Sequence, residues 1–313
     1  MARALVTGGA GFIGSNLTPE LLKLGHSVLV FDDISTGQLE NIPDSPDISL
    51  TRGDIRDYSQ VLAAVAGADV VFHMAAQVGN VLSLQQPDLD LITNASGTIN
   101  LLRACREQGV NRVILSSSSA IFGETQYVPM DENHPKDPVS PYGLSKLAAE
   151  KYCLILGQEY ELSVCCLRYF NVYGVNQYFN PYGNVLPIFV ERALEGQSLT
   201  IYGDGNQTRD FIDVKDIVRA NLLAMESGAQ GAFNIGTGIA TTVNELTKHL
   251  LDAFDYPIEV VYAPPRAGEV LHSLADISKA RHEMSFSPTV SVEQGVKTYV
   301  NWFKERRAQA SKQ

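Results

Sequence analysis

The sequence predicts an α/β fold in which a doubly wound parallel sheet is followed by a smaller C-terminal region. Two observations carry this prediction. Short apolar stretches alternate with helical patterns from the start of the chain to about residue 170, and such alternation is typical of a parallel sheet covered by helices on both faces. A glycine-rich turn also joins the first apolar stretch to the first helical pattern, which is how nucleotide-binding sheets of this class begin.

The elements of the large domain follow in order. Short apolar runs predict strands at residues 3–7, 27–31, 48–52, 69–73, 111–116 and 162–168. Apolar residues at helical spacing predict helices near residues 12–24, 58–65, 93–108 and 142–157. Pro19 lies inside the first of these helices, where a proline is expected to remove one hydrogen bond or to kink the helix.

The alternation ends at Asn171, where Tyr, Asn, Gly and Pro become frequent, and a helix at 188–195 and a strand at 199–202 follow. A later helix and strand have the pattern of a return to the sheet. We therefore expect a large domain over residues 1–170 with a return segment at 212–236, and a smaller region over 171–211 and 237–313. The smaller region should cover the carboxyl edge of the sheet, where ligands of open α/β sheets bind.

The glycine-rich turn predicts a dinucleotide site. Its glycines allow a pyrophosphate to approach the backbone, and the free N–H groups at the start of the following helix attract its charge. The candidate residues are Gly8, Gly11, Phe12, Ile13 and Gly14. An ordinary tight turn between strand and helix is the alternative interpretation.

Asp32 ends the second strand, about twenty residues after the glycine turn, at the position where a carboxylate accepts the adenosine ribose hydroxyls of a Rossmann-like domain. A carboxylate there repels a 2′-phosphate, and no arginine follows at residues 33–38 to compensate for it. The expected cofactor is therefore NAD rather than NADP. The alternative is an aspartate that only caps its own loop.

Tyr142 and Lys146 lie in the first turns of a predicted helix. Ser140 has the position of the N-cap and Pro141 that of the first helical residue. The i,i+4 spacing places the ammonium on the same face as the phenol, and the helix dipole adds to its effect. Both are expected to favour phenolate and so to make Tyr142 a base near neutral pH. A Tyr and a Lys at this spacing are a weak motif alone, so the catalytic interpretation of the pair depends on the predicted cofactor site.

The composition excludes several classes of partner. With 24 Lys and Arg against 35 Asp and Glu, the net charge is −11, which argues against nucleic acid or an anionic membrane as partner. No apolar run has the length of a membrane span, so we expect a cytoplasmic protein without membrane contact. The four cysteines lack C-x-x-C spacing, and we expect reduced, buried thiols and no metal site.

Six motifs in order resemble a known family over essentially the whole chain. They are the glycine turn at 7–14, His73-Met74-Ala75-Ala76, the serine run ending at Ser118 with Phe122-Gly123, Tyr142-x-x-x-Lys146, the segment Arg168–Gly174, and Arg209-Asp210-Phe211. The sequence resembles the extended short-chain dehydrogenase/reductases, and among them the NAD-dependent nucleotide-sugar epimerases and dehydratases.

The resemblance implies a catalytic set of Ser118, Tyr142 and Lys146. It also implies further cofactor residues: Asp33, Asp54 and Ile55 toward the adenosine, Ala75, Ala76, Asn94 and Ser116 along the cofactor, and Tyr169 against the nicotinamide. Tyr142 and Lys146 would contact the cofactor as well.

The implied substrate is a nucleotide diphosphate sugar. Arg209 and Arg266 match the family's pyrophosphate-binding arginines, and Tyr202 would flank the base. Further substrate positions of the family are matched by Ser118, Asn171, Asn184, Val185, Thr200, Glu269 and Ser273. Each has a plainer interpretation, since a single Asn is often a turn residue and a single Arg often a surface charge.

The implied reaction begins at the sugar 4-hydroxyl. Tyr142 would take its proton while C4 gives a hydride to NAD, with Ser118 bonded to the same oxygen. Dehydratases of the family carry Asp-Glu at the positions of Ser119-Ala120, and the related decarboxylases keep the glutamate at Ala120. Neither carboxylate is present here. We therefore expect a 4-epimerase acting through a transient 4-keto sugar. The alternatives are another nucleotide-sugar-modifying oxidoreductase (a uronate epimerase, dehydratase or reductase) and a non-catalytic NAD sensor.

Two finer expectations also come from the resemblance. Ser273 matches the position that controls the space beside C2, and its small side chain predicts that UDP-N-acetylhexosamine (UDP-GlcNAc/GalNAc) is accepted as well as UDP-glucose and UDP-galactose. Uronate epimerases have an arginine near Tyr178, so its absence argues against a 6-carboxylate substrate. The helices at 93–108 and 142–157 match the pair that such proteins pack across a two-fold axis, which predicts a homodimer.

Overall fold

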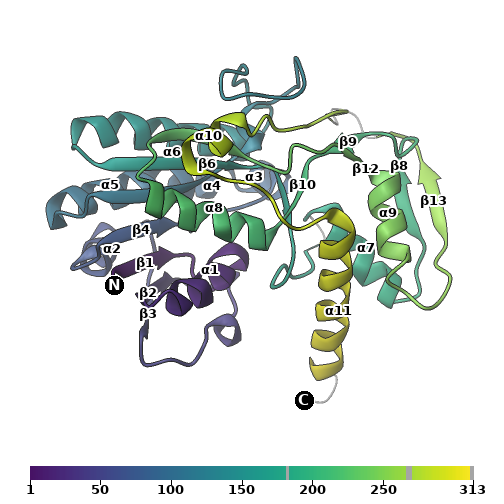
Figure 1. Cartoon of the computed structure of the whole chain (residues 1–313), viewed down its shortest axis with the longest axis horizontal. Helices are drawn as coiled ribbons and strands as arrows, with labels where there is room; N and C mark the ends of the chain where they lie inside the picture. Colours follow the sequence, from purple (N-terminus) through teal and green to yellow (C-terminus); the bar gives the residue numbers. More distant parts are fainter. Residues whose placement is uncertain (181–182, 266–269, 311–313) are drawn as a thin grey trace.

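The large domain is built on a seven-stranded parallel sheet in the computed structural model, which describes residues 1–180, 183–265 and 270–310 (Figure 1). The strand order is β11-β6-β5-β4-β1-β2-β3, and every neighbouring pair is parallel. The strands are β1 (Arg3–Thr7), β2 (Ser27–Asp32), β3 (Ile48–Arg52), β4 (Val70–His73), β5 (Arg112–Ser118), β6 (Ser163–Tyr169) and β11 (Gly231–Ile235). The predicted doubly wound sheet is confirmed, and β11, from the later part of the chain, forms one of its edges.

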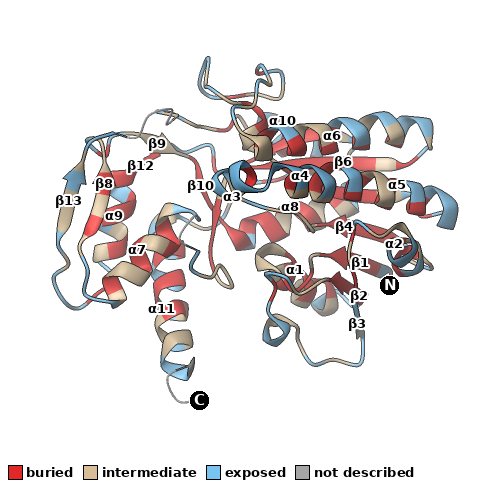
Figure 2. Ribbon diagram, turned by 180° about the vertical axis from the view of Figure 1, so that it is seen from behind, coloured by how far each residue is buried: buried red, intermediate tan, exposed pale blue. Residues whose placement is uncertain are grey.

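Helices cover both faces of this sheet. One face packs against α1 (Phe12–Lys23), α8 (Val214–Ser227) and α10 (Ser278–Met284). The other packs against α2 (Tyr58–Val65), α5 (Gly97–Gln108) and α6 (Pro141–Glu159). Figure 2 shows most strands as a buried layer between helices whose outer faces are exposed, whereas the edge strand β3 is largely exposed. Strand residues alternate between the two apolar clusters, as the pleat requires: Val6 lies on the α1 side and Leu5 on the α5 side.

The predicted strand and helix positions agree with the structure, except between β4 and α5. Two short helices, α3 (Asn80–Gln85) and α4 (Pro87–Leu91), and a π-helical turn (Ile92–Ser96) precede α5. The sequence analysis expected a single helix from residue 93. Pro19 lies within α1, which continues to Lys23.

The smaller region has its own apolar core. Its elements are α7 (Val185–Leu194), β8 (Leu199–Tyr202), α9 (Val243–Leu251), β13 (Val260–Ala263) and α11 (Val292–Ala310). Short strands connect it to the large domain, with β7 (Asn171–Tyr173) paired to β10 (Phe211–Asp213) and β9 (Thr208–Arg209) paired to β12 (Thr241–Thr242). Helix α10 falls in the segment 237–313, which the sequence analysis assigned to this region, but it packs against α8 and β11 of the large domain.

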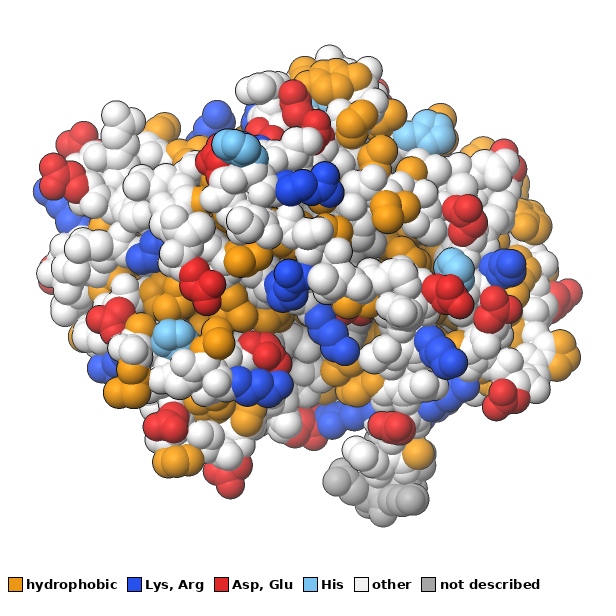
Figure 3. All heavy atoms as spheres, viewed as in Figure 1, with side chains coloured by type: hydrophobic (Ala, Val, Ile, Leu, Met, Phe, Trp, Pro, Cys, Tyr) orange, Lys and Arg blue, Asp and Glu red, His pale blue; other side chains and the backbone are white. Residues whose placement is uncertain are grey.

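The surface and the cysteines agree with the composition. Figure 3 shows acidic and basic side chains interspersed over the face that carries α8, α10 and α11. Cys105, Cys153, Cys165 and Cys166 are buried free thiols, as predicted. Within the described residues, every helix is too short or too polar to cross a lipid bilayer.

Candidate active site

The predicted site residues of the large domain gather at the carboxyl edge of the sheet. The glycine turn follows β1, and Ala75 follows β4, the neighbour of β1 on the other side from β2. Chain connections leave this point in opposite directions, so it is the topological switch point where open α/β sheets bind ligands. Gly8 has a φ of +67°, and a Cβ on it would lie 2.6 Å from the Ala75 nitrogen. Only glycine fits there, because the two loops approach so closely.

The glycine turn fits a dinucleotide pyrophosphate. Gly11 is the N-cap of α1, and no side chain caps the helix, so the first N–H groups at Phe12 and Ile13 are available to an anion. A Cβ on Gly14 would lie 2.3 Å from the Gly8 oxygen, which explains how the helix can begin directly against the turn.

Asp32 is buried at the end of β2, beside the turn. Its Oδ2 accepts a hydrogen bond from the Ala10 nitrogen at 2.9 Å, and its Oδ1 accepts one from Ile34 at 2.8 Å. Burial raises the pKa of the carboxyl group, while these two bonds lower it. Asp32 therefore ties the glycine turn to β2, and its remaining lone pairs are those that would meet ribose hydroxyls.

The other candidate cofactor residues differ in how far their side chains already make contacts within the protein. The Asp54 carboxylate pairs with Arg56 at 2.9 Å from Nε, and the Ile55 side chain is part of the core. Asn94 is buried in the π-helical turn, where its amide bonds to both backbone groups of Gln77 at 2.8 and 2.9 Å. Asn94 thus holds the loop that contains Ala75 and Ala76. The Asp33 Oδ1 accepts hydrogen bonds from Ser35.

Helix α6 places the catalytic candidates. Ser140 is the N-cap, its Oγ accepting from the Gly143 nitrogen at 3.1 Å, and Pro141 is the first helical residue, as predicted. Tyr142 is half-buried and Lys146 is buried. The Lys146 Nζ donates to the Ser116 carbonyl at 2.5 Å, so the ammonium lies at the end of β5, near the strand's last residue, Ser118.

Three influences set the pKa of Tyr142. Burial, the largest, raises it, an interaction with the Ser118 side chain lowers it and the charge of Asp90 raises it, and the resulting pKa is about 12. Lys146 and the helix dipole, which the sequence analysis expected to favour phenolate, are not among these influences. Burial also lowers the pKa of Lys146 to about 8, against the charge of Asp90.

Tyr169 ends β6 beside this group. Its hydroxyl accepts from Asn221 Nδ2 at 2.8 Å and lies 3.9 Å from the Met74 sulfur. Burial raises its pKa. The phenol is therefore held as a neutral hydrogen-bonding group, in a position that lets its ring line the edge of the sheet.

A cleft of about 410 Å³ lies between the large domain and the smaller region. It brings together predicted substrate residues from four separate segments: Asn171, Asn184, Val185, Thr200, Tyr202 and Arg209. The N-cap of α7 is Asn184, and no side chain caps that helix either. Among the described residues that line the cleft there are two arginines and no carboxylate. In a chain of net charge −11, this indicates an anionic ligand.

Two predicted substrate residues that the structure describes, Ser273 and Ser118, lie outside this lining. Ser273 is half-buried, and its nitrogen donates to the Thr208 carbonyl at 3.1 Å, so it lies alongside β9 next to Arg209. Ser118 lies on the cofactor side, at the end of β5. Arg266 and Glu269 lie outside the described residues.

The structure adds two residues that the sequence analysis missed. Asn80 lines the cleft and its Oδ1 accepts from the Ser140 hydroxyl at 3.0 Å, which links the cleft to the start of α6. No motif marks it. Arg192 also lines the cleft, and its position seven residues after Val185 on α7 is the helical spacing that predicts a shared face.

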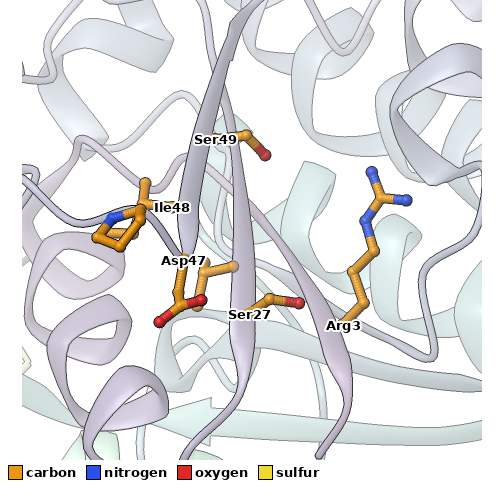
Figure 4. Close-up of a pocket in the computed structure, with 7 residues that line it drawn as sticks. Arg3, Ser27, Asp47, Ile48 and Ser49 are labelled. Carbon is orange, nitrogen blue, oxygen red and sulfur yellow. The ribbon is translucent and has the colours of Figure 1, made fainter.

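A second, shallow pocket of about 170 Å³ lies at the opposite edge of the sheet (Figure 4). Arg3, Ser27 and Ile48 line it at the amino ends of β1, β2 and β3. Ligands of such sheets bind at the carboxyl ends, so this pocket has no part in the site.

Comparison with known proteins gives a consistent result. The model of the NAD dependent epimerase/dehydratase family matches residues 4–236. The chain is 41% identical to the UDP-glucose 4-epimerase of Thermotoga maritima, solved with UDP-glucose, with a TM-score of 0.91 over 97% of this chain and 99% of that one.

Two further solved structures are similar over nearly the whole chain. The UDP-N-acetylglucosamine 4-epimerase of Methanobrevibacter ruminantium, in complex with UDP-N-acetylmuramic acid, has 36% identity and a TM-score of 0.93, covering 97% of this chain and 99% of that one. The UDP-glucose 4-epimerase of Thermus thermophilus, in complex with NAD, has 37% identity and a TM-score of 0.88, covering 96% and 99%.

Proposed function

The chain belongs to the NAD-dependent epimerase/dehydratase family, and from this membership we propose that it is an NAD-dependent 4-epimerase of a UDP-sugar. The observation that supports this most is the position of Tyr142, Lys146 and Ser118. They lie at the same sheet edge as the glycine turn, and Asn80 connects their helix to the cleft that Arg192 and Arg209 line.

The residues suited to hold NAD are those of the switch point. The turn at Gly8–Gly14 would take the pyrophosphate, Asp32 the adenosine ribose and Lys146 the nicotinamide ribose. Bound NAD supplies a hydride acceptor and a positively charged ring. A positive charge there would lower the pKa of the Tyr142 phenol, which the protein's own groups raise to about 12.

The chain's own residues then move one proton. Tyr142 takes it from the sugar 4-hydroxyl, and Ser118, whose side chain lowers the pKa of the phenol, aligns the same oxygen. Lys146 stabilises the phenolate. In the reverse direction Tyr142 returns the proton to the 4-oxygen. It can do so whichever face of C4 receives the returning hydrogen.

The fate of the keto sugar distinguishes an epimerase from a dehydratase. Ser119 and Ala120 directly follow Ser118 in a short 3₁₀ turn, and neither side chain can serve as an acid or base toward C5 and C6. Because these two positions supply no acid or base for the elimination of water, the keto sugar is expected to rotate and to be reduced on its other face. Reduction on that face inverts the configuration at C4.

The substrate we propose is UDP-glucose/UDP-galactose together with the N-acetylated pair. Arg209 in the cleft suits a diphosphate because a guanidinium group offers paired donors. The small side chain of Ser273 next to Arg209 supports acceptance of an N-acetyl group. The similarity to the M. ruminantium UDP-N-acetylglucosamine 4-epimerase points the same way.

The assembly we propose is a homodimer formed through α6. Along this helix Leu144, Tyr152 and Ile155 are 58%, 45% and 63% exposed. Leu84, Leu91 and Ile92, in α3, α4 and the π-helical turn, are exposed as well. The outer residues of α5, such as Arg103 and Glu107, are instead polar.

One experiment tests the function. The purified protein is incubated with UDP-glucose, UDP-galactose, UDP-GlcNAc and UDP-GalNAc in separate reactions without added nicotinamide, and the products are resolved by chromatography. An epimerase restores NAD in each cycle and should convert each sugar to its 4-epimer. Accumulation of a 4-keto-6-deoxy sugar, a strict need for added NADPH, or no turnover of any UDP-sugar would contradict the proposal.

A further inference from the structure

Asp90 is a buried carboxylate that the proposed reaction does not use. It lies in α4, it is 0% exposed, and both of its oxygens accept hydrogen bonds. The Ser145 hydroxyl donates to Oδ2, and Asn94 Nδ2 donates to Oδ1 at 3.3 Å. Because a buried charge is costly unless it is compensated, the presence of this carboxylate requires a reason.

The hydrogen bonds of Asp90 connect it to the catalytic helix. Ser145 precedes Lys146 and follows Tyr142 by three residues, and its hydroxyl also accepts from Asn94 at 3.0 Å. Asn94 in turn bonds to both backbone groups of Gln77, in the loop after β4. Asp90 therefore lies where α4, α6 and a cofactor-lining loop meet.

The charge of Asp90 acts through space on the same two residues. Lys146 is 4% exposed, and neither its ammonium nor the Asp90 carboxylate forms a direct ion pair with any described residue. Each charge nonetheless acts on the pKa of the other group, since charges on buried groups are screened less than charges in water.

We propose that Asp90 is a positioning residue of the reaction, which fixes the Tyr142–Lys146 turn through Ser145 and supplies the negative charge that balances Lys146. This inference rests on the proposed function, because it assigns Asp90 a role in the chemistry of Tyr142.

Burial raises the pKa of Asp90 itself, whereas the Ser145 hydrogen bond and the charge of Lys146 lower it. The pKa shifts of the two catalytic residues agree with the proposed role. Asp90 raises the pKa of Tyr142, and it is the largest influence raising the pKa of Lys146 against burial. Glu150 and Cys166 also raise the pKa of Lys146. The remaining facing group is His73, whose pKa burial lowers to about 3, so it is neutral and adds no charge.

Removal of Asp90 should therefore move two titrations in the same direction. The acidic limb of the kcat profile reports the loss of a proton from Tyr142, and the alkaline limb reports the loss of the Lys146 proton. Without Asp90 both pKa values fall, so both limbs shift to lower pH. A purely structural role would lower kcat without moving the two limbs together.

The test compares Asp90→Asn with Asp88→Asn, which removes an exposed carboxylate from the same helix. Profiles of kcat against pH are measured for both variants and the wild type. In Asp90→Asn we expect both limbs to lie lower by about half a pH unit or more, and in Asp88→Asn we expect neither to move. Unchanged limbs in Asp90→Asn would overturn the inference.

A second measurement does not depend on turnover. The phenolate of Tyr142 is titrated by near-ultraviolet absorbance, as the difference between each protein and its Tyr142→Phe counterpart. Its apparent pKa should be lower in Asp90→Asn than in the wild type, and an equal or higher value would refute the role of the charge. A wild type that turned over no UDP-sugar would contradict the proposed function alone, because this titration would still decide the role of Asp90.

Ser145→Ala serves if Asp90→Asn does not fold. It keeps the carboxylate but removes its link to α6, so kcat should fall several-fold while the two limbs stay where they are. An unchanged kcat in a folded Ser145→Ala protein would show that the link positions nothing.

Discussion

Glu150 and Arg168 form a bidentate ion pair in the core, with 2.7 Å between Arg168 Nη2 and Glu150 Oε1 and 3.0 Å between Nε and Oε2. The side chains are 0% and 4% exposed. The Ser117 hydroxyl donates to the same carboxylate at 2.7 Å. One carboxylate thus ties α6 to both β5 and β6, and because Glu150 lies eight residues after Tyr142, it anchors the helical face that carries the catalytic pair.

Glu150→Gln should destabilise the protein strongly. It leaves the Arg168 guanidinium buried without a counterion, and breaking a buried pair on one side costs about 3–5 kcal/mol. Urea denaturation would measure the loss of unfolding free energy. The double variant Glu150→Leu/Arg168→Met should recover much of it, because no unpaired charge remains.

Glu20→Gln is the matched control, since it breaks the exposed Glu20–Lys23 pair, which is also 2.7 Å long. Exposed pairs contribute about 0–1 kcal/mol, so this variant should unfold almost as the wild type does. Equal losses in Glu150→Gln and Glu20→Gln would show that the core pair is not what holds α6.

Tyr142→Phe should lower kcat by at least ~10², the lower end for loss of a general acid–base group. NAD should stay bound, because the hydroxyl is removed without disturbing the glycine turn. Steady-state kinetics and the absorbance of released nucleotide measure the two effects. Tyr152→Phe, on an exposed position of the same helix, should be fully active. Near-normal turnover in Tyr142→Phe would remove Tyr142 from the mechanism.

The fold could be predicted because its signals are local. Strand and helix periods, the glycine turn and the N-cap at Ser140 depend on neighbours in the sequence, and each was found where expected. The segment between β4 and α5 could not be divided correctly, because a π-helical turn between two short helices has no sequence period of its own.

The site was predicted less completely. The structure places Ser118, Tyr142 and Lys146 near one edge of the sheet, but the state of the phenol depends on burial and on Asp90, which lies 52 positions earlier in the chain. Sequence spacing reports the effect of Lys146 on Tyr142 and nothing of desolvation. Asn80 was missed for a similar reason: its contact with Ser140 bridges 60 residues.

Asp32 should make the protein prefer NAD to NADP. Its carboxylate already accepts two backbone N–H bonds, so it is fixed in place and a 2′-phosphate would meet an uncompensated negative charge. Titration calorimetry with each dinucleotide should give clearly weaker binding of NADP. The variant Asp44→Asn, at an exposed position in the chain between β2 and β3, should leave the preference unchanged. Equal binding of both dinucleotides by the wild type would mean that Asp32 only organises its own loop.

Ile155→Glu should convert a homodimer into a monomer. The Ile155 side chain is 63% exposed on α6, and a charge at the centre of an apolar contact between two copies would be buried without a partner. Light scattering at micromolar concentration measures the mass. Leu24→Glu, at a position after α1 that is 52% exposed, should leave the mass unchanged. A wild-type monomer would contradict the dimer, and the apolar face of α6 would then need another explanation.

Ser273→Tyr tests the preference for N-acetylated sugars. The backbone of Ser273 is held against Thr208, the residue before Arg209, so a larger side chain there extends from a fixed point beside the cleft that Arg209 lines. An aromatic ring would occupy the space beside C2 and collide with an N-acetyl group, whereas a 2-hydroxyl would still fit.

The variant should keep the interconversion of UDP-glucose and UDP-galactose and lose that of the N-acetylated pair. The measurement is kcat/KM for all four sugars. Because the N-acetyl group would no longer fit, kcat/KM for the N-acetylated sugars should fall relative to that for the plain sugars by about tenfold to a few hundredfold. Ser278→Tyr, at an exposed position at the start of α10, should leave the ratio as it is. If Ser273→Tyr lowered both activities equally, or neither, Ser273 would be a residue of the chain beside β9 that never meets the sugar, and acceptance of N-acetyl groups would have to come from elsewhere in the cleft.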